Sequence, residues 1–485
     1  MSKLKRLINQ LSDKDLQIIH ENLRSCEAHK SAELLKLFRE GKLSDADIKT
    51  SLDVNNNAFY TLRSRLNEKI ESYFLEQSDT PRTVLLQQVA AIGEIVLSQN
   101  KTIAVATLKK LEKELQSYDL SNELTQVYKA LKKLSIHSPE SFEYSQLYNK
   151  HVAYMLAQDK AEDMLVDYFK RYNDYLNNYE KPDSMSLGLI VEKLEQNSQL
   201  YQSHRLNVYY QCVSIFHKLY VQPIDIDDKV ALKEMLKIFD VVQNYFDIYR
   251  MDPTYHSLKW VFLYLQMLLQ YRYNKYDKVD EIIKQLNPIA NHLLVNYSLY
   301  TSSSYFLFIK LERAVALGTQ RTLASENAKT FKNFEVDKDD VGNFLAYTNY
   351  RALCLINAGK QKDAANLLSE VLSTVNTKNH ILALLDTKLF LATAYYLSGQ
   401  SRKTIFILNN VQRQIRLLGK ETCEHTYYYM KVIKSSLTEL AESKKEKKIQ
   451  NYSAKFEEAA KPFNSPLRFI DTAIFELEKE SVSVM

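Results

Sequence analysis

The chain has 485 residues, of which only eight are glycine and eight are proline. Soluble proteins usually contain about 7% glycine and 5% proline, so this chain has few residues for the turns of a sheet-rich fold, and we expect an all-α protein. The 64 lysines and arginines almost balance the 59 aspartates and glutamates. Net charge alone therefore does not indicate a nucleic-acid or anionic-membrane partner.

The cysteine pattern and the N-terminus indicate a reducing, cytoplasmic environment. Cys26, Cys212, Cys354 and Cys423 lie far apart and form no CxxC pair, so we expect no disulfide framework. The first ten residues contain no apolar run of signal-peptide length, and no stretch approaches 18 uninterrupted apolar residues. We therefore expect no membrane-spanning segment and no membrane partner.

Residues 1–78 are predicted to form a small N-terminal helical domain. Ser44 followed by Asp47 is the pattern of a capping box and predicts that a helix begins there. A longer helix follows after Asp53. Its apolar face is formed by residues spaced three or four positions apart, namely Phe59, Leu62, Leu66 and Ile70.

These last two helices resemble the DNA-binding helix-turn-helix. The resemblance rests on the apolar positions Ile48, Leu52, Val54, Phe59 and Leu62. It implies a recognition helix whose DNA-contacting residues would be Asn57, Thr61, Arg63, Ser64 and Lys69. Lys49 stands where the motif has a small residue and Asp53 where it has glycine, and 13 basic residues face 12 acidic ones over residues 1–76. DNA binding draws on phosphate neutralisation, so a structural helix pair is favoured and DNA binding is the alternative. The segment also resembles the opening of large bacterial helical-repeat proteins.

Residues 79–443 are predicted to be a long succession of helices with short polar breaks. Thr80 and Pro81 can cap and start the first of them. Residues 142–177 are predicted to form a pair of helices, with one tyrosine-lined packing face made by Tyr168, Tyr172, Tyr175 and Tyr179. Asn274 stands at a turn between two later helices, where it can adopt the left-handed conformation.

The segment from 343 to 411 contains one helical hairpin pattern twice. The first copy consists of Ala352, Leu355, Gly359, Ala364, Leu368 and Val371. Forty residues later stand Ala392, Tyr395, Gly399, Thr404, Leu408 and Val411. Each copy predicts two helices that approach closely at small residues and are joined by a glycine turn. Because one such pair cannot bury its apolar stripe alone, stacked copies are expected to form a helical solenoid.

Both copies resemble tetratricopeptide repeats, although their offset of 40 exceeds the family period of 34. The resemblance implies a right-handed superhelical solenoid that binds a peptide or helix in a groove lined by the first helix of each repeat. Carried over by position, the groove residues are Asn349, Leu353, Ile356, Asn357, Leu389, Thr393 and Tyr396. No cationic pair for a terminal carboxylate stands at these positions, so an apolar or amide-bonding peptide is the expected ligand.

Residues 444–485 are predicted to comprise a basic linker and a C-terminal capping helix. The lysine-rich run 444–448 would be a solvated helix end or part of the linker, and Pro466 would start a helix over 467–479. This helix would cover the end of the array. Its use as a detachable partner helix is the alternative.

The sequence offers no motif for catalysis. No two glycines lie within ten residues of one another, which leaves no phosphate loop or dinucleotide fingerprint. Cys423 and His425 are two positions apart on a predicted helix and would point to different faces. We therefore expect no cofactor, no metal and no enzyme, but a protein–protein interaction scaffold. A DNA-binding transcriptional regulator with a repeat-based sensor or oligomerisation domain is the alternative, and a small-molecule or enzymatic role ranks third. Homo-oligomer formation stays open.

Overall fold

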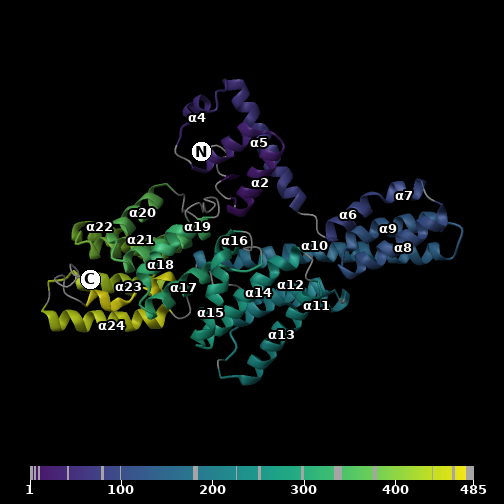
Figure 1. Ribbon diagram of the computed structural model, residues 1–485. Coiled ribbons are helices and arrows are strands. Elements are labelled where there is room, and N and C mark those ends of the chain that lie inside the picture. The colour runs from purple at the N-terminus through teal and green to yellow at the C-terminus, as the bar shows by residue number, and fades with distance from the viewer. Residues whose placement is uncertain are drawn as a thin grey trace. The chain divides into compact units, whose positions relative to one another are not determined.

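The computed structural model describes residues 4, 7, 8, 11, 13–40, 43–77, 81–98, 100–178, 184–201, 203–225, 227–249, 253–295, 300–331, 341–374, 380–439, 441–460 and 465–476. All regular secondary structure in these residues is helical, as the low glycine and proline content predicts. The chain divides into two compact units, residues 1–148 and 149–485 (Figure 1).

The first unit contains two separate apolar cores. The N-terminal core is formed by α2 (Asp13–Ser25), α3 (His29–Glu40), α4 (Asp45–Ser51) and α5 (Asn56–Gln77). The other lies among α6 (Pro81–Ala90), α7 (Ile92–Ser98), α8 (Lys101–Ser117), α9 (Ser121–Leu134) and the start of α10 (Glu140–Asn178). The unit ends inside α10, which is a single helix of 39 residues. The prediction of a helix pair over 142–177 is wrong, because no residue in this range breaks the helix.

Local signals in the N-terminal core are confirmed. The Ser44 side chain accepts a hydrogen bond from the backbone N–H of Asp47 at 3.3 Å, and the backbone N–H of Ser44 donates to Asp47 Oδ2 at 3.2 Å. This reciprocal pair is the predicted capping box. At the turn that follows α4, Asp53 has a φ of +49°. Asp53 thus adopts the conformation for which the helix-turn-helix motif uses glycine.

The second unit begins with the rest of α10 and continues through α11 (Ser184–Tyr201), α12 (His204–Tyr220), α13 (Lys229–Ile248), α14 (Pro253–Arg272), α15 (Tyr276–Leu286), η1 (Asn287–Ile289) and α16 (Ala290–Val295). Then follow α17 (Ser304–Ala316), α18 (Gln320–Thr330), α19 (Val341–Asn357), α20 (Gln361–Thr374), α21 (Ile381–Leu397) and α22 (Ser401–Leu418). The chain ends in η2 (Glu421–Cys423), α23 (Glu424–Ser436), α24 (Glu442–Ala460), η3 (Pro466–Phe469) and η4 (Thr472–Phe475).

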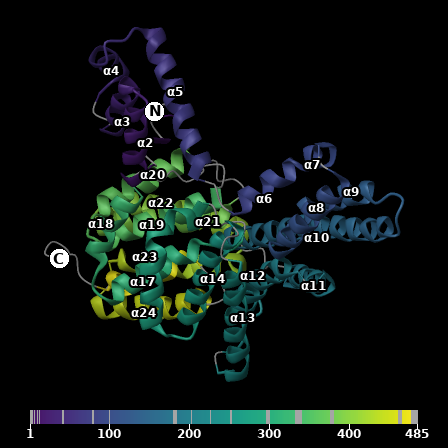
Figure 2. The ribbon, with the colours of Figure 1, turned by 45° about the vertical axis from the view of Figure 1, so that its right-hand side comes forward.

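Neighbouring helices of the second unit pack as hairpins. α19 contacts α20, α21 contacts α22, and α23 contacts α24. The first helices of successive hairpins also pack on one another. α19 contacts both α17 and α21, and α21 contacts α23. Figure 2 shows α19 to α22 in green lying together, with the yellow α24 beside α17 and α23.

The turns and small residues of the two hairpin copies are as predicted. Gly359 and Gly399 have φ values of +78° and +75°, which only glycine adopts without cost. Ala352 and Ala392 are fully buried, so their helices approach closely. Asn274 has a φ of +56°, which confirms its left-handed turn.

The tyrosine face on α10 is confirmed for the two tyrosines whose side chains are described. Tyr168 and Tyr172 are fully buried, as a packing face requires. The side chains of Tyr175 and Tyr179 lie outside the described residues.

The C-terminal residues differ from the prediction. The lysine-rich run 444–448 lies in the first turns of α24, so it is the helix end of the two alternatives and not a linker. The single helix expected over 467–479 is wrong in its described part, which forms two short 3₁₀ turns. Ile470 is extended between them, and the Asp471 side chain accepts a hydrogen bond from the N–H of Ala473 at 2.9 Å. The apolar side chains of this segment are buried against other helices, which outweighs its helical periodicity.

Candidate functional site

The predicted groove residues lie on two neighbouring helices. Four of them belong to α19 and three to α21, and these helices pack on each other. Six of the seven are buried, namely Asn349, Leu353, Ile356, Leu389, Thr393 and Tyr396, whereas Asn357 is half-buried. The structure therefore brings the residues onto adjacent helices, and most of them are covered.

The chain's own C-terminal segment, residues 465–476, packs on both of these helices. η3 contacts α17, α19 and α21, and η4 contacts α23. Ser465 donates a hydrogen bond from Oγ to Asp386 Oδ2 on α21 at 2.9 Å. We call the side of α17, α19, α21 and α23 that this segment contacts the covered face.

One stripe of α21 runs beneath the segment. Asp386 and Tyr396 both contact the C-terminal segment, and Leu389 and Thr393 stand between them at helical spacing. Residues three, seven and ten positions apart share a helix face. Two of the predicted groove residues, Leu389 and Thr393, are therefore on the same stripe as both contacts.

Aromatic contacts hold the rest of the segment. The ring of Phe475 lies 5.3 Å from the ring of Tyr396 and 6.0 Å from that of Tyr429 on α23. Phe469 stacks on Phe308 of α17 with ring centroids 5.1 Å apart. Such pairs contribute about 0.5–1.5 kcal/mol each beyond the area they bury. Leu467, Ile470 and Phe475 are buried as well, so the segment is bound along its length.

A buried polar cluster surrounds the Ser465 anchor. Asp386 is 2% exposed, and its Oδ1 lies 3.9 Å from Nε2 of the fully buried His425. Burial lowers the pKa of His425 to about 3, so the imidazole is neutral near pH 7. Burial, with the nearby Asp386 carboxyl group, raises the pKa of the Cys423 thiol to about 11. Thr426 Oγ1 lies 3.1 Å from His425 Nε2.

This cluster has the geometry of an anchor. The Ser465 hydroxyl donates to the carboxyl group of Asp386 and also accepts the backbone N–H of Leu467 at 3.3 Å. Ser465 itself is only 2% exposed, which leaves no approach for a substrate. The arrangement therefore recognises a hydroxyl group on a chain that crosses α21.

Next to η3 the covered face retains a cavity of about 510 Å³. It is lined by residues of α14, α17, α19, α24 and the C-terminal segment, among them the groove residue Asn357 and Arg468. The Tyr271 hydroxyl donates to Glu312 at the wall. The C-terminal segment thus leaves part of this face open to a further side chain.

The DNA contacts implied by the helix-turn-helix resemblance are only partly brought together. Asn57, Thr61 and Ser64 are exposed at helical spacing on α5. Arg63 is half-buried, with its guanidinium 3.6 Å from Asp45 and 5.7 Å from the centre of the Phe59 ring. Arg63 is therefore engaged within the domain and does not lie on the exposed face.

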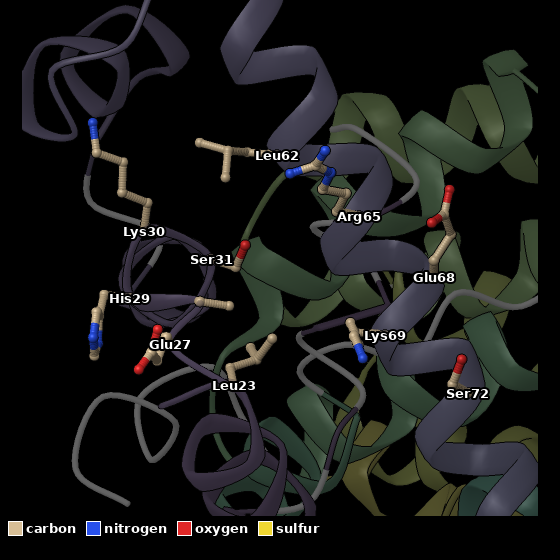
Figure 3. A pocket seen from close by; sticks show the side chains of 11 residues that line it. Leu23, Glu27, His29, Lys30, Ser31, Leu62, Arg65, Glu68, Lys69 and Ser72 are labelled. Atoms are coloured by element: carbon tan, nitrogen blue, oxygen red, sulfur yellow. The ribbon is translucent and has the colours of Figure 1, made fainter. Parts of the chain in front are cut away.

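Lys69 instead lines a pocket of about 580 Å³ in the N-terminal core. Figure 3 shows Leu62, Arg65 and Lys69 of α5 on one side of this pocket and Lys30 and Ser31 on the other. Lys30 donates a hydrogen bond to the carbonyl of Asp53 at 3.1 Å. Acidic residues also line the pocket, so it presents no single charge to a ligand.

Sequence reasoning missed Asp386, His425, Ser465 and Phe475 as functional residues. One signal was present, because Asp386 is the only acidic residue in the mostly apolar helix 381–397. A buried carboxyl group requires a hydrogen-bonding partner. That partner is 79 residues away in sequence, so no local pattern identifies it.

Comparisons with known proteins supply no relative. No family model, curated protein or solved structure matches the chain. Across the described residues, no three histidine, cysteine, aspartate or glutamate side chains converge as a metal-binding group. In the same part of the chain, no helix has the length and apolar character needed to cross a lipid bilayer.

Proposed function

We propose that the protein is a non-catalytic, cytoplasmic interaction scaffold whose covered face binds an extended peptide. In this proposal the hairpins of the second unit form a tetratricopeptide-like superhelical array, and α17, α19, α21 and α23 line its groove. One observation carries the proposal: α19 and α21, which hold the residues assigned to the groove, already bind a short segment of the same chain, with Asp386 and Tyr396 of α21 among the contacts. A face that binds one peptide through a hydroxyl anchor and apolar pockets has the chemistry to bind another.

The groove chemistry favours an uncharged, apolar peptide. Leu353, Leu389 and Tyr396 supply apolar surface, and Asn349 and Thr393 supply buried polar groups. Thr393 Oγ1 lies 3.0 Å from the Tyr429 hydroxyl, which fixes the position of an aromatic wall. Specificity would come from the spacing of apolar side chains and one hydroxyl, because no charged pair stands at the assigned positions.

The test is affinity purification from the native cell, followed by mass spectrometry. The parent for this test is the full chain with Ser465→Asp, which removes the hydroxyl anchor of the C-terminal segment and opens the covered face. The variant Asn349→Ala combined with Tyr396→Ala removes one polar and one aromatic groove contact. Asn366→Ala combined with Phe406→Ala makes similar changes at exposed positions of α20 and α22. We expect the parent and the control to retain the same proteins and the groove variant to lose them. Equal retention by all three would contradict a groove at these residues.

DNA binding by the N-terminal core is a second candidate, favoured by one observation. The left-handed Asp53 makes the α4–α5 turn without glycine, which removes one departure from the helix-turn-helix pattern. The full chain would be titrated with a duplex library at roughly 50 and 200 mM salt, since phosphate contacts weaken steeply with salt. Binding that falls with salt and is reduced by Asn57→Ala with Thr61→Ala would support this function. The absence of salt-dependent duplex binding would exclude this function.

A further inference from the structure

We propose that the C-terminal segment is a resident competitor for the peptide groove, so that a partner peptide binds only after residues 465–476 leave the covered face. This inference rests on the proposed function and adds both its regulation and the pattern of the partner. Autoinhibition of this kind requires that the segment bind specifically and that it can be displaced. The contacts of the segment meet both requirements.

Specific binding follows from the order of the anchors. The hydroxyl of Ser465 is bound by Asp386, and Leu467 is fully buried two positions later. Phe469 lies on Phe308, and Phe475 occupies the aromatic pocket of Tyr396 and Tyr429. One short segment therefore contacts four helices, α17, α19, α21 and α23, through anchors at fixed positions along its sequence.

Displacement is favoured because the segment has little structure of its own. Its backbone hydrogen bonds include four that each span a single turn, as from the N–H of Ile470 to the carbonyl of Leu467 and from the N–H of Glu476 to that of Ala473. Such 3₁₀ turns are weak in isolation, so the segment keeps its conformation through contacts with the face. A segment held in this way can detach without unfolding the helices beneath it.

The covalent connection makes the segment an effective competitor. Only residues 461–464 separate α24 from the segment. A short connection gives a tethered ligand an effective concentration in the millimolar range. A free peptide of equal intrinsic affinity would be excluded at micromolar concentration while the segment is attached.

The anchors also define the partner. It is a peptide with a hydroxyl residue, a leucine two positions later, an aromatic residue four positions later and a second aromatic residue ten positions later, as in Ser465, Leu467, Phe469 and Phe475. An acidic group in place of the hydroxyl would meet the buried carboxyl group of Asp386 and be repelled. A phosphate on that serine would be repelled more strongly.

The experiment uses the full chain with residues 461–464 replaced by a site-specific protease sequence, which is cut after folding. The probe is a fluorescein-labelled synthetic peptide with the sequence of residues 462–479, in excess over the chain. Fluorescence anisotropy before and after cutting measures its binding. We expect at least tenfold tighter binding after cutting, and at least a tenfold loss when the peptide carries Ser465→Asp or is scrambled.

A second variant opens the groove without cutting. Ser465→Asp in the uncut chain weakens the attached segment and leaves the face unchanged, so it should bind the unmodified peptide as the cut chain does. Light scattering should give a monomer mass before cutting. A dimer that disappears on cutting would overturn the single-chain arrangement and indicate exchange of the segment between two copies.

The failures are distinguishable. Equal peptide affinity of the cut and uncut chains would contradict the role of residues 465–476 as a competitor. It would not contradict peptide binding in the groove. No binding by a cut chain that keeps its helical circular dichroism and cooperative melting, and none by the Ser465→Asp chain, would overturn the groove itself. That second outcome would remove the basis of the proposed function.

Discussion

Two of the helices that carry predicted site residues, α5 and α21, have opposite environments. On α5 the polar residues Thr61 and Ser64 are exposed, and their hydroxyls bond within the same helix. On α21 Asp386 and Thr393 are buried and bond to residues 36 or more positions away. Polar side chains of α5 can therefore be changed at little cost to stability, whereas those of α21 take part in tertiary structure. A ligand of α21 must displace a group that is already bound.

The largest expected effect is on stability and separates the two helices directly. Ala392→Arg would place a long cation at a fully buried position of α21, and we expect a loss of about 3 kcal/mol or more in the free energy of unfolding. Ser64→Arg on exposed α5 should change it by less than about 0.5 kcal/mol. Urea unfolding measures both. A melting temperature of Ala392→Arg within about 2 °C of the parent would contradict the close packing of these helices.

The next effect concerns pH and the cluster beneath α21. The pKa of His425 is about 3 in the folded chain against about 6.5 when unfolded, so below pH 6.5 the unfolded state binds the additional proton. Stability is therefore complete above pH 6.5 and is lost as the pH falls towards 3, by up to about 2 kcal/mol at pH 5. Asp386 opposes this loss, because its carboxyl group would stabilise a protonated imidazole.

His425→Gln tests that sign. Unfolding by urea at pH 7 and pH 5 should show a smaller loss of stability in the variant than in the parent. Asn366→Ala, which changes an exposed side chain of α20 that does not titrate, should leave the pH dependence of the parent unaltered. A steeper decline in His425→Gln would show that the buried imidazole is not the group that limits acid stability.

A smaller effect is expected at the start of α4, in the helix pair that contains α5. Ser44→Ala removes the side-chain acceptor of the capping box and should cost about 1 kcal/mol. The loss should appear as faster amide hydrogen exchange in α4, without a change in the second unit. Unchanged exchange at Asp47 and Ile48 would argue that the cap is not formed in solution.

The smallest effect tests a feature that the two units share. Asp53 and Asn274 both make left-handed turns with φ near +50°, so glycine at either position should change stability by less than about 0.5 kcal/mol. Alanine at either position should cost about 1 kcal/mol, because its β-carbon disfavours this conformation. Thermal melts of the four variants distinguish these outcomes. An alanine variant as stable as its glycine counterpart would contradict the left-handed turn.

Local patterns were predictable from the sequence, whereas long-range contacts were not. The capping box at Ser44, the turns at Gly359 and Asn274, and the burial of Ala352 follow from residues within a few positions of one another. The sequence analysis divided α10 into two helices, although no residue between 142 and 177 gives a signal for a helix end. The C-terminal segment was predicted as a helix from the periodicity of Phe469, Ile470 and Ala473. Its described conformation is set by distant partners such as Asp386.

The most direct test of the account replaces Phe475 with the photoreactive residue p-benzoylphenylalanine in the full chain. After irradiation, peptides cross-linked within one chain are identified by mass spectrometry. Because the Phe475 ring contacts Tyr396 and Tyr429, the account predicts adducts to peptides from α21 and α23 in the monomer. Adducts confined to other helices, or none within the chain, would contradict the placement of the C-terminal segment on the covered face.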